Sequence, residues 1–105
     1  MTKQEYIDYH ADACERMKAI TKAKNDDYTG GSVDPFANFN MVEHFGVATT
    51  AAGMFIRMTD KFSRIASFLK QGVLSVKDES IEDTLLDLAN YCIIMAAHIK
   101  SLKEK

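Results

Sequence analysis

Four charged residues stand at helical spacing near the middle of the chain: Arg57, Asp60, Lys61 and Arg64. Positions i, i+3, i+4 and i+7 of an α-helix lie on one face, so this row would present three cations and one carboxylate together. Cationic side chains held side by side bind anions, and phosphate above all. The alternative is a solvated helix face with internal ion pairs, such as Asp60 with Arg64.

A second polar stripe follows later in the chain, at steps of three and four residues: Glu79, Asp83, Asp87, Asn90 and Tyr91. Acids in the first turn of a helix complement its dipole, but Asp87 lies too far along for that explanation. Half-buried polar groups need partners, and the cations of the first row are the nearest candidates. Two outcomes stay open: a neutralised structural network, or a cleft in which carboxylates bind Mg²⁺ and cations bind phosphates.

Residues 25–34 have the composition of a loop, with two carboxylates, an aromatic ring and paired glycines. Tyr28 in this loop would offer a surface for stacking a nucleobase, and the alternative is an ordinary polar turn. Asn38 stands beside two phenylalanines, where an amide either bonds the start of a helix or contacts a ligand. The paired glycines lack the lysine and the helix entry of a phosphate-binding P-loop.

Apolar spacing and capping residues predict four helices that position these side chains. Thr2 and Glu5 form a capping-box pattern, Asp34 before Pro35 marks a helix start, and Gly72 marks a helix end. Thr49 or Thr50 can cap the third helix, and Asp78 or Ser80 can cap the last. Gly53 inside a helix suggests the close approach of another helix or of a ligand. The expected helices cover about residues 3–24, 34–45, 49–71 and 78–102.

The chain is expected to form one domain over residues 1–105, since a single hydrophobic core is the normal solution at this length. The predicted fold is all-α, a compact bundle of three long helices and one short helix. Six Phe, four Tyr and six Met are more large apolar side chains than one small bundle easily covers. We therefore expect a homo-oligomer.

A formal net charge of −2 argues against a partner such as long nucleic acid, which requires a strongly basic surface. A small phosphorylated ligand needs only local cations. The sequence shows no apolar run that we expect to span a bilayer and no hydrophobic core of a signal peptide, so we expect a cytoplasmic protein without a membrane partner.

Four segments of the chain resemble the nucleotide modification associated domain family of phages and bacteria. They are Lys24 to Tyr28, Phe36 to Phe39, Arg57 to Arg64 and Glu79 to Tyr91. The resemblance runs from Lys24 to Tyr91 and implies a nucleotide-related role, often on phage genomes, which would place the protein in the host cytoplasm. It also adds Lys24 to the ligand-binding candidates.

More distantly, the layout is similar to the all-α NTP pyrophosphohydrolases of the MazG and dimeric dUTPase type. That similarity implies Mg²⁺-dependent hydrolysis, and at the matching positions only Asp60 and Asp83 are acids. Asp87 would serve with these two as a substitute catalytic carboxylate, and Glu79, Glu82 or Asp87 would substitute as metal ligands. Lys61 and Arg64 stand where those enzymes carry acids, which changes the site from a metal cage towards an anion-binding surface.

The leading hypothesis is a phosphorylated nucleotide bound in a cleft between the last two long helices. Its phosphates would contact Arg57, Lys61 and Arg64. Its ribose or base would contact Asn38 and Asn90, and Tyr28 or Tyr91 would stack on it. Whether Mg²⁺-dependent pyrophosphate hydrolysis follows is left open. The alternatives are non-catalytic sequestration of a host signalling nucleotide, of the cyclic or ADP-ribose type, and a purely structural helical module.

Overall fold

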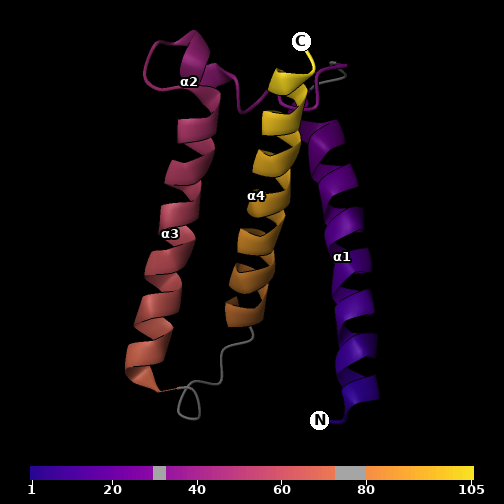
Figure 1. Cartoon of the computed structure of the whole chain (residues 1–105). Coiled ribbons are helices and arrows are strands. Elements are labelled where there is room, and N and C mark those ends of the chain that lie inside the picture. The colour runs from indigo at the N-terminus through magenta and orange to yellow at the C-terminus, as the bar shows by residue number, and fades with distance from the viewer. Residues whose placement is uncertain (30–32, 73–79) are drawn as a thin grey trace.

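The computed structural model describes residues 1–29, 33–72 and 80–105, without the side chains of residues 26–29 and 80. Within these ranges the chain forms four helices and no strand (Figure 1). Their bounds are α1 (Lys3–Thr29), α2 (Met41–His44), α3 (Thr50–Gln71) and α4 (Ser80–Lys103). The prediction of an all-α fold with three long helices and one short helix is confirmed.

The helix α4 is the central element of the fold (Figure 1). It packs most extensively against α3, which runs antiparallel to it, and less extensively against α1. The short α2 sits on the N-terminal part of α3. Among the described residues, α1 makes no contact with α3, so α4 alone connects the two outer long helices.

The predicted capping residues form the expected helix ends. Thr2 Oγ1 accepts a hydrogen bond from Glu5 N at 3.1 Å, and a Glu5 carboxylate oxygen accepts from Thr2 N at 3.4 Å. Thr49 Oγ1 accepts from Ala52 N at 3.1 Å, which satisfies an N–H group at the start of α3. Gly72 follows α3 with φ +86°, a conformation that glycine adopts without steric cost.

The prediction that the first helix ends near residue 24 is wrong, because α1 continues to Thr29. Asn25 was interpreted as the start of a loop, yet asparagine costs a helix only a few tenths of a kcal/mol, and no Gly or Pro occurs before Gly30. Its side-chain amide donates to the Pro35 carbonyl at 2.7 Å. This bond connects the late part of α1 to the segment that follows it.

The predicted helix over residues 34–45 is also wrong in its extent, since only Met41–His44 is helical and residues 35–40 form turns. Asp34 does cap this segment, because its carboxylate accepts from Phe36 N at 2.9 Å and from the Asn40 amide at 2.8 Å. The first bond closes a turn at Asp34, and residues 35–40 continue as turns rather than as a helix. Of the two cap candidates for the last helix, Asp78 lies outside the described residues.

Two side-chain hydrogen bonds connect α1 to α4. Tyr9 Oη donates to Glu82 Oε1 at 2.7 Å, and Thr21 Oγ1 donates to Asn90 Oδ1 at 3.0 Å. The hydrogen bond to the Glu82 carboxylate raises the pKa of Tyr9. Because the folded-state pKa of Tyr9 is raised, its hydrogen bond to Glu82 stabilises the fold below the ordinary tyrosine pKa. This stabilisation is lost as the pH rises through the folded-state pKa.

Little of the apolar surface is buried within one chain. The buried hydrophobic residues of the described part are Ala13, Met54 and Met58. By contrast, large side chains recur every seven residues on one flank of each helix in the α3–α4 pair, where they are exposed. We call this surface the uncharged face, and it consists of Phe55, Phe62 and Leu69 on α3 and Leu85, Cys92 and Ile99 on α4.

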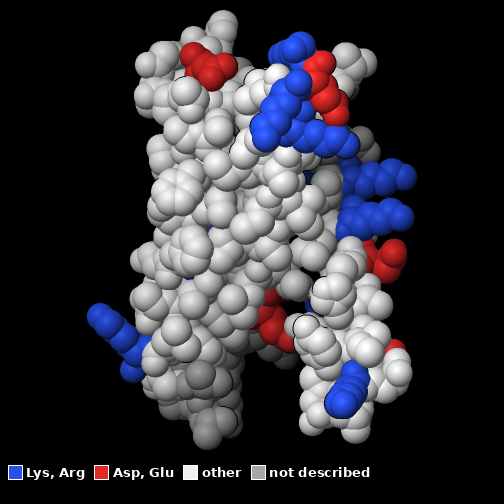
Figure 2. Space-filling model, in the orientation of Figure 1, with Lys and Arg blue, Asp and Glu red and all other residues white. Residues whose placement is uncertain are grey.

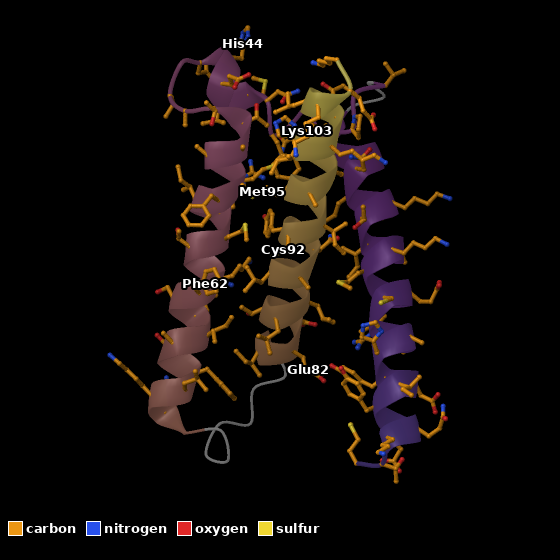
Figure 3. The ribbon with its side chains drawn as sticks, in the orientation of Figure 1. His44, Phe62, Glu82, Cys92, Met95 and Lys103 are labelled. Carbon is orange, nitrogen blue, oxygen red and sulfur yellow. The ribbon has the colours of Figure 1, made fainter. Side chains whose placement is uncertain are left out.

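On the face drawn in Figure 2, charged side chains are absent from most of the surface over α3 and α4 and lie toward its ends. Figure 3 labels Phe62 on α3 and Cys92 on α4, on neighbouring parts of the two helices. Neighbouring exposed apolar side chains are typical of surfaces that contact another molecule.

The segment Ile81–Lys103 of α4 is long and apolar enough to cross a membrane. The expectation that no such run exists in the sequence was therefore wrong. The core helix of a helical protein meets the same test when it is mostly buried, whereas only 6% of this segment is buried within one chain. Here α4 packs against both α3 and α1, and its first turn carries Glu82 and Asp83.

Gly53 of α3 lies against Val42 of α2. A Cβ at this position would lie 2.6 Å from Val42 Cγ1, so the predicted close approach of another helix is confirmed. We expect Gly53→Ala to lower the free energy of unfolding by about 1–2 kcal/mol, because the clash outweighs the gain of about 1 kcal/mol in helix propensity. Urea denaturation measures this.

The double variant Val42→Ala/Gly53→Ala removes the clash and keeps the propensity gain. We expect it to be at least as stable as Val42→Ala alone. A Gly53→Ala protein more stable than the unmodified chain would show that α2 does not pack against α3 as described.

Candidate functional site

Lys61 is the member of the charged row that lies between α3 and α4. Its ammonium nitrogen is 3.5 Å from Asp87 Oδ2, and its side chain is only 15% exposed. The predicted pairing of the two polar stripes across antiparallel helices is thus present in this one contact. A cation this shielded from water depends on its partner more than a surface cation does.

Arg64 and Asp60 behave differently from Lys61. Arg64 Nε lies 3.3 Å from Asp60 Oδ2, one helical turn away, and both side chains are about 60% exposed. This is the intrahelical pair expected for a solvated helix face. Such pairs contribute at most about 1 kcal/mol to stability, so Arg64 can change partners at little cost.

Arg57 is positioned by an aromatic ring. Its guanidinium carbon lies 4.7 Å from the centroid of the Phe39 ring, and Phe39 in turn meets Tyr91 edge-to-face at 6.4 Å. We call these three residues the Arg57 stack. Within the described part of the chain, Arg57 forms no ion pair with a carboxylate. A guanidinium held over a ring keeps its N–H donors at its edge, where a phosphate can accept two of them.

The other predicted ligand-binding residues differ in their burial and in their hydrogen-bond partners. Asn38 is half-buried in the turn next to Phe39. Asn90 accepts from Thr21 on α1, which leaves its amide N–H groups for another partner. Lys24 is exposed on α1. The side chain of Tyr28 and the whole of Glu79 lie outside the described residues.

The predicted catalytic and metal-binding acids do not form a cluster in the described part of the chain. Asp60 pairs with Arg64, Asp87 pairs with Lys61, and Asp83 is exposed in the first turn of α4. No group of three or more His, Cys, Asp or Glu side chains in residues 1–29, 33–72 and 80–105 could hold a metal ion. The described acids Asp60, Asp83 and Asp87 therefore do not converge on one point that could hold Mg²⁺.

Residues 49–99 match the family model described as nucleotide modification associated domain 1. The match covers just under half of the 105-residue chain and includes α3, most of α4 and the residues of the Lys61–Asp87 pair. It confirms the resemblance to that family for this segment, while the earlier segments from Lys24 to Phe39 lie outside it. No curated protein and no solved structure matches the chain, and the comparisons give no support to the similarity with pyrophosphohydrolases.

Two residues of the site were missed from the sequence. Phe39 was predicted only as an apolar side chain of a short helix, and Thr21 was not singled out. No local signal identifies either role, because both depend on how distant segments fold against α3 and α4.

Lys61 and Arg64 give a matched pair of variants. We expect Lys61→Met to lower the free energy of unfolding by about 1–2 kcal/mol, because it leaves the Asp87 carboxylate without its partner. Arg64→Met should change it by less than about 0.5 kcal/mol, since the Asp60 pair is solvated. Urea denaturation of both variants tests this, and equal small effects would show that Lys61 and Asp87 do not pair in solution.

Proposed function

We propose that this protein binds a phosphorylated nucleotide through the polar flank of α3 and does not hydrolyse it. The observation that carries the proposal is the Arg57 stack, which fixes a guanidinium without a carboxylate partner among the described residues. The match of residues 49–99 to a family described as nucleotide modification associated supports a nucleotide as the ligand.

The same flank of α3 supplies further cations for the phosphates. Arg57 and Arg64 are seven residues apart and therefore lie on one side of the helix, with Lys61 between them in the contact with α4. In this proposal Arg57 donates two N–H groups to the first phosphate. Arg64 leaves its ion pair with Asp60 and binds the next phosphate. Lys61 adds positive potential while it stays paired with Asp87.

The nucleoside part of the ligand would lie toward the turn that carries Phe39. Asn38 adjoins that ring, and Tyr91 supports it from α4. Asn90 accepts from Thr21 through its oxygen, and in this proposal its amide N–H groups would donate to ribose hydroxyls. Lys24 and Tyr28 belong to the proposal as further contacts from α1.

Binding without hydrolysis follows from the pairing of the acids. Hydrolysis of a nucleoside triphosphate requires several carboxylates around Mg²⁺, whereas Asp60 and Asp87 each face a cation. A small protein of this kind would serve to sequester a host signalling nucleotide, of the cyclic or ADP-ribose type. The competing hypothesis is a hydrolase that uses Asp60, Asp83 and Asp87.

Arg57→Ala tests the proposal. We expect calorimetry against nucleoside triphosphates, cyclic dinucleotides and ADP-ribose to find a ligand whose affinity survives excess EDTA. Arg57→Ala should weaken that affinity about 10- to 100-fold, as expected for the loss of a charge-assisted pair of hydrogen bonds. Arg16 on α1 is the matched control. Like Arg57 it lies over an aromatic ring, that of Tyr9, but unlike Arg57 it pairs with a carboxylate, that of Asp12.

Two results would contradict the proposal. In one, Arg57→Ala and Arg16→Ala bind every ligand as the unmodified protein does. In the other, Mg²⁺-dependent release of pyrophosphate is rapid and is lost in Asp83→Asn and Asp87→Asn, which would identify a working hydrolase.

We also propose that a second copy of the chain covers the uncharged face. Large side chains at every seventh position of α3 alternate with Ala52, Thr59 and Ala66, so the surface carries both knobs and holes. A two-fold axis would bring identical faces together. The 22 residues of α3 extend about 33 Å, and two packed helices present a strip of the size that an interface of about 800 Å² per partner requires.

The two cysteines report on this contact. Cys14 on α1 and Cys92 on the uncharged face are both exposed in a single chain. We expect a maleimide to label Cys14 rapidly and Cys92 slowly, and light scattering to give at least twice the 11.8 kDa of one chain. Phe62→Glu should yield a monomer and expose Cys92. Equal labelling of both thiols in an 11.8 kDa particle would exclude the dimer.

A further inference from the structure

The helix α1 is the least covered of the three long helices. Between Lys3 and Lys24, Ala13 is its one buried residue, and α4 is the one helix that α1 contacts in the described part of the chain. Figure 1 shows α1 at the edge of the molecule, on the side of α4 that is opposite to α3. Most of the surface of α1 is therefore open to a ligand or to another chain.

His10 and Cys14 lie side by side on this open surface. His10 Nδ1 is 3.8 Å from Cys14 Sγ, and both side chains are exposed. A tetrahedral zinc ion binds sulfur at about 2.3 Å and nitrogen at about 2.0 Å, so two such ligands of one ion lie about 3.6 Å apart. The imidazole and the thiol therefore already have nearly the separation that two ligands of one zinc ion require.

One chain supplies only half of such a site. Structural zinc takes four protein ligands, and Cys₂His₂ is one of its usual sets. Within residues 1–29, 33–72 and 80–105, no third His, Cys, Asp or Glu joins His10 and Cys14 in a group that could hold a metal ion. A two-fold axis would double the pair and give two thiolates and two imidazoles.

The charges of α1 fit a second copy of this helix in antiparallel orientation. From Glu5 to Glu15 the sequence contains four acids and no Lys or Arg, and from Arg16 to Lys24 it contains four bases and no acid. The helix dipole does not explain this separation, because it acts within the first and last turns and the last turn of α1 has no basic residue. Antiparallel copies would place the acidic half of each helix beside the basic half of the other.

We propose that His10 and Cys14 form half of a zinc site, which a second copy of the chain completes by packing its α1 antiparallel against this one. His10 of each chain then faces Cys14 of the other. The same register brings the acids that precede His10 near the bases that follow Cys14, for example Asp8 near Lys18 of the second copy. The contact uses no residue of the Arg57 stack or of the uncharged face, so it is independent of phosphate binding and of the contact proposed there.

Cobalt(II) is the probe, because its visible absorption is strong in a tetrahedral site with thiolate ligands and weak when water surrounds it. The full chain is reduced, freed of metal with EDTA, desalted and titrated with Co²⁺. We expect a tetrahedral spectrum that saturates at one cobalt per two chains, whether or not the uncharged face forms a dimer, and that zinc abolishes by displacement. Saturation at one metal per chain, or a spectrum without a thiolate band, would overturn the proposal.

Cys14→Ser and His10→Gln test the two ligands. Both side chains are exposed, so we expect both variants to fold and to bind cobalt at least 100-fold more weakly than the unmodified chain. His44→Gln, at the end of α2, is the control and should bind cobalt unchanged. Zinc should also protect Cys14 of the metal-free chain from maleimide. Unchanged cobalt binding in Cys14→Ser or in His10→Gln would overturn the site.

Charge reversal tests the antiparallel partner. Lys18→Glu/Lys22→Glu places acids in the basic half of α1, and Asp8→Lys/Glu15→Lys places bases in the acidic half. Each variant alone should bind cobalt about tenfold more weakly, because like charges then meet across the contact. An equimolar mixture of the two should recover the affinity and the ratio of one cobalt per two chains. A mixture that binds no more tightly than either variant alone would overturn the antiparallel arrangement.

Discussion

The helices α3 and α4 pack antiparallel, and Lys61 lies in their contact with its ammonium 3.5 Å from an Asp87 oxygen. This contact determines which side chains of α3 remain exposed to a ligand or to a partner. Because Lys61, Met54 and Met58 face α4, helical geometry leaves Arg57 and Arg64 on one flank of α3 and Phe55, Phe62 and Leu69 on the other. One flank then carries the proposed phosphate contacts, and the other forms the uncharged face.

The features that could be predicted from the sequence are local ones. The caps at Thr2 and Thr49 and the glycine after α3 depend on neighbouring residues, and all three formed as expected. The Lys61–Asp87 pair was partly foreseeable, because a short connection favours antiparallel neighbours and a mid-helix carboxylate needs a cation. The extent of α1 was misjudged on a local signal, because asparagine is tolerated in a helix and no Gly or Pro precedes Gly30.

The remaining site features depend on tertiary packing. Phe39 contacts Arg57 from a segment, residues 35–40, that forms turns where a helix was expected. Asn90 was expected to face the cations of α3, but it accepts a hydrogen bond from α1.

The central claim is that α3 presents a fixed arginine to a phosphorylated ligand without a metal ion. Native mass spectrometry of freshly purified protein tests it most directly, because it weighs the assembly and any retained ligand together. The account predicts an assembly of two or more 11.8 kDa chains that carries a phosphorus-containing ligand after EDTA treatment and loses it in Arg57→Ala. A ligand that remains bound in Arg57→Ala, or that EDTA removes from the unmodified protein, would contradict it.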